Sequence, residues 1–286
     1  MSKAVVIQEF DINKIAYSKP KNYNGAQCIN IVYPGSGYLH LQTPLMSSFG
    51  ISKNQTDGKY SMTLILDVNS TEEDKEEVRT FEKVMRELQD KIIDDIVSDE
   101  KKEWKKILNL DNKYDKLNKE VKKLMIENKL GNKIVKEPKI KDKGYSNLMN
   151  VKIREYNSSL KVDTYLMNDK KNLYTENGQP KLYDAFKLLY REFQDKKPPV
   201  NVIGIITFSI WVLNGNIYIS PSMTQVIVKE QQKISSKVSI NEKGIDGFIE
   251  KDINSNSDDD EQEEEEVEEE EEVDDDEEQM PKVVRR

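Results

Sequence analysis

The sequence predicts an α+β fold, in which an antiparallel β-barrel is interrupted by a helical hairpin and followed by a disordered acidic tail. Three observations predict it. Strand-like segments occur before residue 70 and again after residue 147. Between them, apolar residues recur at helical spacing. A run of acidic residues then closes the chain. The expected organisation is one domain over residues 1–230 with a helical insertion at about 70–131, a polar linker over 231–257 and a tail over 258–286.

The first strand group lies before the insertion. Residues 28–33 are mostly apolar, and Pro34-Gly35-Ser36-Gly37 supplies turn residues, so residues 38–43 are expected to return as the partner strand of a hairpin. Residues 60–67 follow a polar loop at 53–59, and their alternation predicts a third strand with one buried face. Together they favour an antiparallel meander.

The insertion reads as two helices. Ser70 and Thr71 offer a capping residue ahead of an acidic first turn, and apolar residues recur at helical spacing from Val78 to Ile96. A second amphipathic stretch runs from Trp104 to about residue 130 and stops near Gly131. We therefore expect a helical hairpin between the two strand groups.

The second strand group begins at residues 148–156, where Lys152 and Arg154 oppose two apolar residues and give the strand one basic face. Short strands are expected at 163–167 and 172–174, and a helix at 182–193. Asn214-Gly215 joins residues 201–213 to 216–220 as a hairpin, and 224–229 completes the sheet. An oligonucleotide-binding (OB) barrel is the smallest architecture of this kind.

The charge of the chain is divided between two parts. The last 29 residues hold 18 acidic and 3 basic residues, a net charge of −15. The whole chain has a net charge of −9, so residues 1–257 carry +6. A run of like charge this dense buries too little apolar surface to offset the entropy lost on ordering, so we expect the tail to be disordered.

Several classes of function are disfavoured. Cys28 and His40 are the only residues of their types, which removes disulfides, ordinary zinc sites and catalytic triads. No glycine-rich phosphate loop or metal-binding carboxylate motif is present. We therefore expect a protein that is not an enzyme and needs no metal or cofactor. No apolar stretch approaches the roughly 20 residues of a membrane span and no signal peptide begins the chain, so we expect a cytoplasmic or nuclear location.

Basic and aromatic residues recur as neighbours. A cationic groove with rings for base stacking is typical of proteins that bind single-stranded nucleic acid. For any one residue, a solubilising lysine or a half-buried tyrosine is the simpler interpretation, so the set is what counts. The candidate binding residues are Lys19, Lys21, Tyr23, Lys143, Tyr145, Lys152, Arg154, Tyr156 and Tyr165.

The tail has two interpretations. Its charge and spacing are similar to those of a strand of phosphates, so it could compete with nucleic acid for a cationic groove on the same chain. Alternatively it is a plain solubility segment, or the basic-protein binding segment of an acidic-tailed histone chaperone or virion scaffold protein. The first interpretation needs residues 1–257 to bind oligonucleotide, and the second does not.

The order of segments over about residues 25–230 resembles the single-stranded DNA-binding proteins of nucleocytoplasmic large DNA viruses. The likeness rests on the strand pair at 28–43, the strand from Tyr60, the helical insertion, the segments at 148–154 and 164–170, and the closing hairpin. It implies an OB barrel that binds single-stranded DNA during viral replication, repair and recombination. RNA binding and assembly of several copies on DNA stay open.

The acidic tail is similar to those of phage and bacterial single-strand binders, where such tails recruit replication proteins and restrain DNA binding. Phage-type binders lack the long helical hairpin, so the resemblance favours the eukaryotic virus group.

Overall fold

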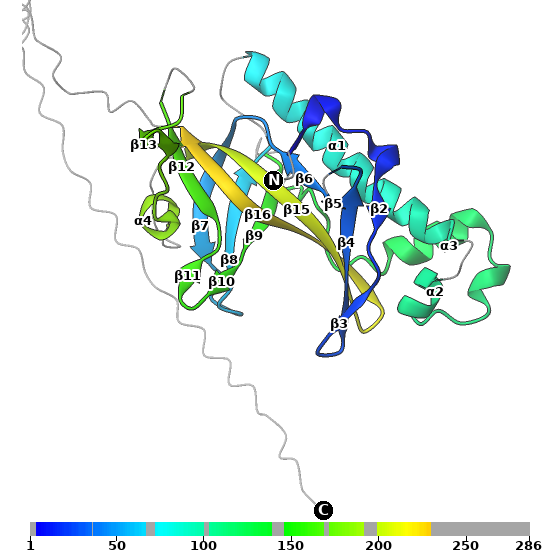
Figure 1. The fold of residues 1–286 in the computed structure, drawn as a ribbon. Coiled ribbons are helices and arrows are strands. Elements are labelled where there is room, and N and C mark those ends of the chain that lie inside the picture. Colours follow the sequence, from blue (N-terminus) through cyan, green and yellow to red (C-terminus); the bar gives the residue numbers. More distant parts are fainter. Residues whose placement is uncertain are drawn as a thin grey trace, which may run out of the picture. The chain divides into compact units, whose positions relative to one another are not determined.

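We describe the protein from a computed structural model over residues 4–35, 37–66, 72–99, 103–138, 146–168, 172–191 and 199–229. These residues belong to one compact unit that extends to Lys233. The predicted linker at 231–257 and tail at 258–286 lie outside the described residues. The α+β class is confirmed, since the described chain is mostly strands with a few helices (Figure 1). None of the helices described is long and apolar enough to cross a membrane.

The longest strands form a hairpin, β15 (Val200–Leu213) and β16 (Asn216–Lys229). Their turn is the predicted Asn214-Gly215, and both residues have the positive φ angles, 52° and 74°, that a tight hairpin turn requires. The two predicted segments at 216–220 and 224–229 are therefore one strand. A register shift in β16, opposite Ile205 and Ile206 of β15, lies between the two segments that were predicted as separate strands.

Backbone pairing leads from β15 around to β16. β15 pairs with β7 (Met46–Lys53), β7 with β8 (Tyr60–Ile65), and β8 with β9 (Leu148–Ile153), all antiparallel. β9 then pairs in parallel with β16, where Lys152 lies opposite Ser222. Because β15 and β16 also pair with each other, the five strands complete a circuit of pairings.

Further strands extend this circuit. β4 (Ala26–Tyr33) pairs with the part of β15 near the Asn214-Gly215 turn. It also pairs with β2 (Ala16–Tyr17), β3 (Lys21–Tyr23) and β5 (Gly37–Tyr38). β6 (His40–Gln42) joins β15 to β1 (Val5–Val6), and β12 (Asp163–Met167) pairs in parallel with β16. Two small hairpins are β10–β11 (Glu155–Tyr156, Ser159–Leu160) and β13–β14 (Thr175–Glu176, Gln179–Pro180).

The predicted meander is wrong. Of the predicted return strand at 38–43, only its start, in β5, pairs with β4. The chain then leaves β4, and β6 pairs with β15 instead. The strand from Tyr60 lies next to β7, a strand that the sequence analysis missed. β7 contains a register shift between Ser48 and Ile51, around Gly50 with φ of +82°, and this irregularity breaks the alternation that marks a strand.

The first predicted helix is confirmed as α1 (Glu72–Val97), which buries Val78, Phe81, Met85, Leu88, Ile92 and Ile96 along one stripe. The second arm is not one helix. It consists of α2 (Glu103–Ile107), the 3-10 turn η3 (Tyr114–Lys116) and α3 (Lys119–Glu127). Asn109, at φ of +50°, ends the first piece, and the Asn118 side chain caps the last by accepting from the N–H of Val121. α3 packs on α1 (Figure 1).

The remaining helices are short. Near the N-terminus lie two 3-10 turns, η1 (Ile7–Glu9) and η2 (Ile12–Lys14). The helix predicted over 182–193 is only α4 (Ala185–Leu189), because Asp184 caps its start and Tyr190 is already extended. The next N–H, of Arg191, donates to the carbonyl of Ile51 on β7 at 2.8 Å. This bond fixes α4 against the sheet.

Gly50 offers a test of that contact. A Cβ on Gly50 would clash with the backbone oxygen of Leu189, and its positive φ strains any other residue. We expect Gly50→Ala to destabilise the fold by about 3 kcal/mol or more, from strain together with overpacking. Gly178→Ala is the matched control, since Gly178 has φ of +76° but open space around it. Its cost should be about 1–2 kcal/mol. Urea unfolding measures both, and equal losses would show that α4 does not pack here.

Candidate nucleic-acid interface

A cleft of about 680 Å³ lies where β9 meets the β15–β16 hairpin, and we name it the central cleft. The hairpin contributes mostly small side chains, Ser209, Ser220 and Ser222, together with Trp211. Small side chains leave room for a ligand against the sheet. The residues that line the cleft are Asp57, Gly58, Lys59, Tyr60, Lys152, Ile153, Arg154, Glu155, Ser209, Trp211, Ser220 and Ser222.

Cations from separate segments meet at this cleft. Cys28 on β4 is opposite Lys21 on β3 and opposite Trp211 on β15. Burial raises the pKa of the Cys28 thiol, while the charges of Arg154, Lys21 and Lys152 act in the opposite direction. All three cations are therefore close enough to Cys28 for their charges to be felt there. The strand pairing places Lys21 opposite Cys28 and Lys152 opposite Ser222, so these cations come from different parts of the sheet.

Lys152 lines the central cleft and is affected by the charge of Lys59. Partial desolvation in the cleft and the repulsion of Lys59 lower the pKa of Lys152, with a smaller opposing effect from Asp57. Desolvation and a like charge both disfavour the protonated amine. A bound anion would offset both effects and hold the lysine in its charged form.

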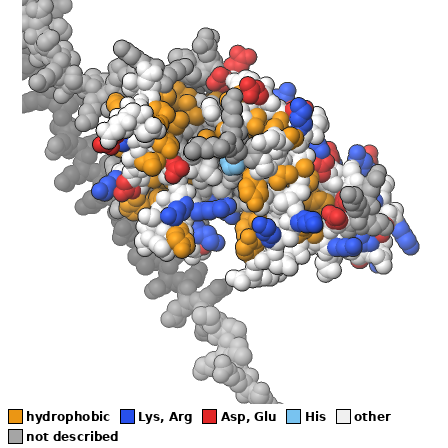
Figure 2. Space-filling view, in the orientation of Figure 1, with side chains coloured by type: hydrophobic (Ala, Val, Ile, Leu, Met, Phe, Trp, Pro, Cys, Tyr) orange, Lys and Arg blue, Asp and Glu red, His pale blue; other side chains and the backbone are white. Residues whose placement is uncertain are grey.

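Most of this charge has no acidic partner. Among the described residues, no carboxylate lies within 4 Å of the charged nitrogens of Lys21, Lys152 or Arg154. Lys59 has one exposed contact, to Asp57 at 3.3 Å. Unpaired cations around one concave surface create a positive potential that attracts a polyanion. Figure 2 shows Lys and Arg side chains gathered across the lower part of the described face, with hydrophobic side chains between them.

Two aromatic rings lie beside these cations. Trp211 is half-buried, and its Nε1 donates to the hydroxyl of Ser209 at 3.2 Å, which fixes the ring on the sheet. Tyr23 from β3 lies against it, with 5.6 Å between the ring centroids and 49° between the planes. Tyr23 is 51 % exposed, so one ring is anchored and the other is accessible. Rings next to cations suit the bases and phosphates of one strand.

A second, more apolar groove of about 210 Å³ lies further along the hairpin. Ile203 and Ile205 line it, and by strand alternation they share the face of β15 that carries Ser209 and Trp211. Tyr165 on β12 also lines this groove. The two hollows therefore lie on one side of the hairpin.

The structure places the predicted binding residues differently. Lys152 and Arg154 line the central cleft. Tyr23 packs on Trp211, which lines it, and Lys21 lies on the same strand as Tyr23, opposite Cys28. Tyr165 lines the second groove. Tyr156, 64 % exposed on β10 with Lys161 over its ring, and Lys19, exposed ahead of β3, are not among the described residues that line the cleft. Lys143 and Tyr145 lie outside the described residues.

Sequence reasoning missed Trp211 and Lys59. Trp211 lies between the buried residues Ile210 and Val212, so alternation alone places its side chain on the opposite face of the sheet, where Ser209 also lies. That signal was present in the sequence. Lys59 precedes β8 in a polar loop and carries no comparable signal.

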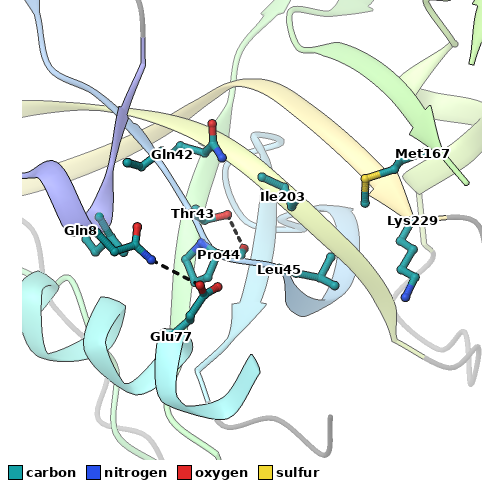
Figure 3. A pocket seen from close by; sticks show the side chains of 11 residues that line it. Gln8, Gln42, Thr43, Pro44, Leu45, Glu77, Met167, Ile203 and Lys229 are labelled. Carbon is teal, nitrogen blue, oxygen red and sulfur yellow. Dashed lines mark hydrogen bonds between the residues drawn. The ribbon is translucent and has the colours of Figure 1, made fainter. Parts of the chain in front are cut away.

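Another cavity has a different character. It measures about 180 Å³ and lies between α1, the residues after β6 and the ends of β15 and β16 (Figure 3). Gln8 donates from its side-chain amide to Glu77 at 3.3 Å, and the Thr43 hydroxyl donates to the carbonyl of Pro44 at 2.9 Å. In the described part of its lining, Lys229 is the one cation and no aromatic ring is present. This cavity therefore lacks the combination of several cations with aromatic rings that the central cleft has. Within the described ranges, no group of three or more His, Cys, Asp or Glu side chains is placed to hold a metal ion.

Among known proteins, similarity to this chain was found in solved structures and not in sequences. No protein-family model matches the chain, and no curated protein matches its sequence. It is similar to a solved C-terminal truncation of the single-stranded DNA-binding protein from bacteriophage Enc34, at 11 % identity and a TM-score of 0.36, covering 77 % of this chain and 98 % of that one. It is also similar to the same phage protein in complex with single-stranded DNA, at 13 % identity and a TM-score of 0.37, covering 77 % of this chain and 97 % of that one. The resemblance to the single-stranded DNA-binding proteins of eukaryotic DNA viruses stays a prediction.

Proposed function

We propose that this chain is a sequence-independent single-stranded DNA-binding protein without enzymatic activity, and that the central cleft holds the DNA. One observation carries the proposal. Lys152 and Arg154, which have no acidic partners among the described residues, line the central cleft together with Trp211, and the exposed ring of Tyr23 packs against Trp211. Phosphates would lie against the cations, and bases would stack on the rings.

The geometry favours a single strand over a duplex. In a duplex the faces of the bases are covered by their neighbours, so rings set in a cleft reach bases only where they are unpaired and splayed out. Stacking and phosphate contacts are available to every base, which is why binding should not depend on sequence. Serine hydroxyls on the hairpin add hydrogen-bonding groups that suit any nucleotide.

The circuit of pairings from β15 through β7, β8 and β9 to β16 supports an OB-type barrel as the scaffold. We place the protein in DNA replication, repair and recombination, in a viral setting in the cytoplasm or nucleus of the host. Several copies would bind side by side along one strand. RNA is the alternative polymer, because neither stacking nor phosphate contact excludes the 2′-hydroxyl.

The tail is proposed to regulate this binding. Residues 258–286 carry −15, and a flexible tether would hold them near the cationic cleft at roughly millimolar effective concentration. They would displace short or weakly bound oligonucleotides while long strands, with more contacts, compete successfully. The same segment would recruit replication proteins once DNA has displaced it.

Truncation after residue 257 tests the tail together with the binding. Labelled oligo(dT) should bind the full chain better than a duplex of equal length does, and truncation should tighten the binding of short oligo(dT), most strongly at low salt. An electrophoretic shift assay measures each complex. No shift with either protein would reject DNA binding, and unchanged affinity after truncation would remove the competitive role of the tail. Tail-dependent histone binding without oligonucleotide binding would instead favour an acidic-tailed chaperone.

A further inference from the structure

A second cationic groove, of about 180 Å³, adjoins the central cleft and shares Asp57, Lys59, Tyr60 and Lys152 with it. Its other wall comes from the segment that leads from the helical insertion back to the sheet. We name residues 129–136 the strap and this hollow the strap groove. The remaining residues that line it are Asn54, Ser61, Asn132, Lys133, Ile134, Lys136, Asn150, Ile219 and Pro221.

The strap is fixed to β16 by its backbone and by one side chain. The N–H of Gly131 donates to the carbonyl of Ile217 at 2.8 Å, and the N–H of Ile217 donates to the carbonyl of Lys129 at 2.8 Å. The Asn132 amide bonds both backbone groups of Ile219, donating to its carbonyl at 2.6 Å and accepting from its N–H at 2.9 Å. A side chain that satisfies both groups of a strand residue replaces a neighbouring strand.

The other end of the strap is fixed as well. The N–H of Ile134 donates to the side chain of Gln89 on α1 at 3.1 Å, and Ile134 and Val135 are buried. Lys136 and Leu148 exchange two backbone hydrogen bonds, of 2.8 and 2.9 Å, at the start of β9. The strap therefore spans from β16 to β9 along a defined path. The backbone positions from which Lys133 and Lys136 extend are therefore fixed.

Lys133 and Lys136 carry unpaired charge. Both are exposed, and among the described residues no carboxylate lies within 4 Å of their amines. With Lys59 and Lys152 they give the groove four lysines against one acidic residue, Asp57, among the residues that the structure describes. Among the described residues, Tyr60 is the only aromatic residue in its lining, and it is nearly buried. The groove is equipped to bind phosphates rather than to stack bases.

We propose that the strap groove is a second phosphate-binding subsite for the same DNA strand. Resting on the proposed function, it extends the path of a strand that leaves the central cleft past Lys59 and Lys152 and continues over Lys133 and Lys136. The helical insertion then has a role in binding, because it supplies the strap. The subsite adds affinity only for strands long enough to reach it.

A length series of oligo(dT) tests this with the variant K133Q/K136Q, which removes two exposed charges and leaves the strap backbone intact. The matched control K116Q/K119Q removes two exposed lysines near α3. We expect the variant to bind the shortest oligonucleotides as the unaltered chain does. On longer ones its affinity should fall about tenfold or more at low salt, with the slope of log K against log salt reduced by about 1.4, since each phosphate contact on a single strand contributes about 0.7.

The outcomes separate this subsite from the proposed function. If the unaltered chain binds but K133Q/K136Q keeps its affinity and salt slope at every length, the subsite is overturned and the proposed function stands. Equal losses at every length, including the shortest, would also overturn it, because the lysines would then act within the central cleft. If the unaltered chain binds no oligonucleotide of any length, both proposals fail together.

Discussion

Replacing Lys152 and Arg154 together by glutamine is expected to weaken oligo(dT) binding by about 100-fold or more at low salt. Each side chain is proposed to make a charge-assisted hydrogen bond to a phosphate, and such bonds contribute about 1.5–3 kcal/mol each. Both side chains line the central cleft, and neither has an acidic partner among the described residues. Their loss should therefore remove binding energy without releasing a buried carboxylate. Fluorescence anisotropy of labelled oligo(dT) measures the affinity.

The salt dependence identifies the cause of that loss. Two missing phosphate contacts should reduce the slope of log K against log salt by about 1.4. The charge-conserving exchange K152R/R154K should retain most of the slope while losing some affinity, because a guanidinium and an ammonium do not bond a phosphate in the same way. The control K116Q/K119Q should change neither quantity. An unchanged slope in K152Q/R154Q would mean that DNA does not contact these residues.

Removing the rings of Tyr23 and Trp211 should lower the affinity for oligo(dT) without changing its salt dependence. Tyr23→Leu and Trp211→Leu are each expected to weaken oligo(dT) binding by about 5- to 150-fold, the equivalent of about 1–3 kcal/mol for each stacked base. The salt slope should stay as it is, because no charge is removed. Anisotropy titrations at several salt concentrations measure both quantities.

Tyr23 gives the cleaner variant of the two. Its ring is half exposed on β3, whereas Trp211 also donates to Ser209 and so contributes to the sheet. Tyr23→Phe is the matched control and should keep most of the affinity, since stacking needs the ring and not the hydroxyl. Full affinity in Tyr23→Leu would exclude a base at this ring, and thermal unfolding of Trp211→Leu separates a loss of binding from a loss of fold.

Several parts of the fold follow from local patterns in the sequence. The stripe of apolar residues along α1 has one helical period over its whole length, and Asn214-Gly215 is the strongest hairpin signal in the chain. Alternation in residues 151–154 correctly places Val151 and Ile153 inside and Lys152 and Arg154 outside. These features need no long-range information.

Two of the errors have local causes, and one has a long-range cause. Gly50 interrupts β7, so that strand has no readable alternation. The second helical arm has enough apolar residues for one helix, yet Asn109 at a positive φ and the cap at Asn118 divide it. The chain after Tyr38 leaves β4 for β15, and only the long hairpin that forms later in the sequence makes this possible.

Composition predicted a cationic, aromatic surface but not which of its residues would meet. The central cleft combines Lys59, residues 152–154 and Trp211, with Tyr23 packed on Trp211, and these residues come from separate parts of the sequence. Cys28 on β4 lies between Lys21 and Trp211, and β9 brings Lys152 beside Ser222. No spacing in the sequence encodes these contacts, which is why exposed neighbours such as Lys19 and Tyr156 were equally good candidates.

The fluorescence of Trp211 tests most directly whether the central cleft holds DNA. The chain has two tryptophans, and Trp104 is buried against Tyr17, away from the cleft lining, so Trp104→Phe leaves Trp211 as the only reporter. Titration of this variant with oligo(dT) should quench Trp211 with the same midpoint as the anisotropy of the labelled DNA, and added salt should reverse both signals. Binding without any change in Trp211 fluorescence, or no binding at low salt, would contradict DNA binding at this cleft.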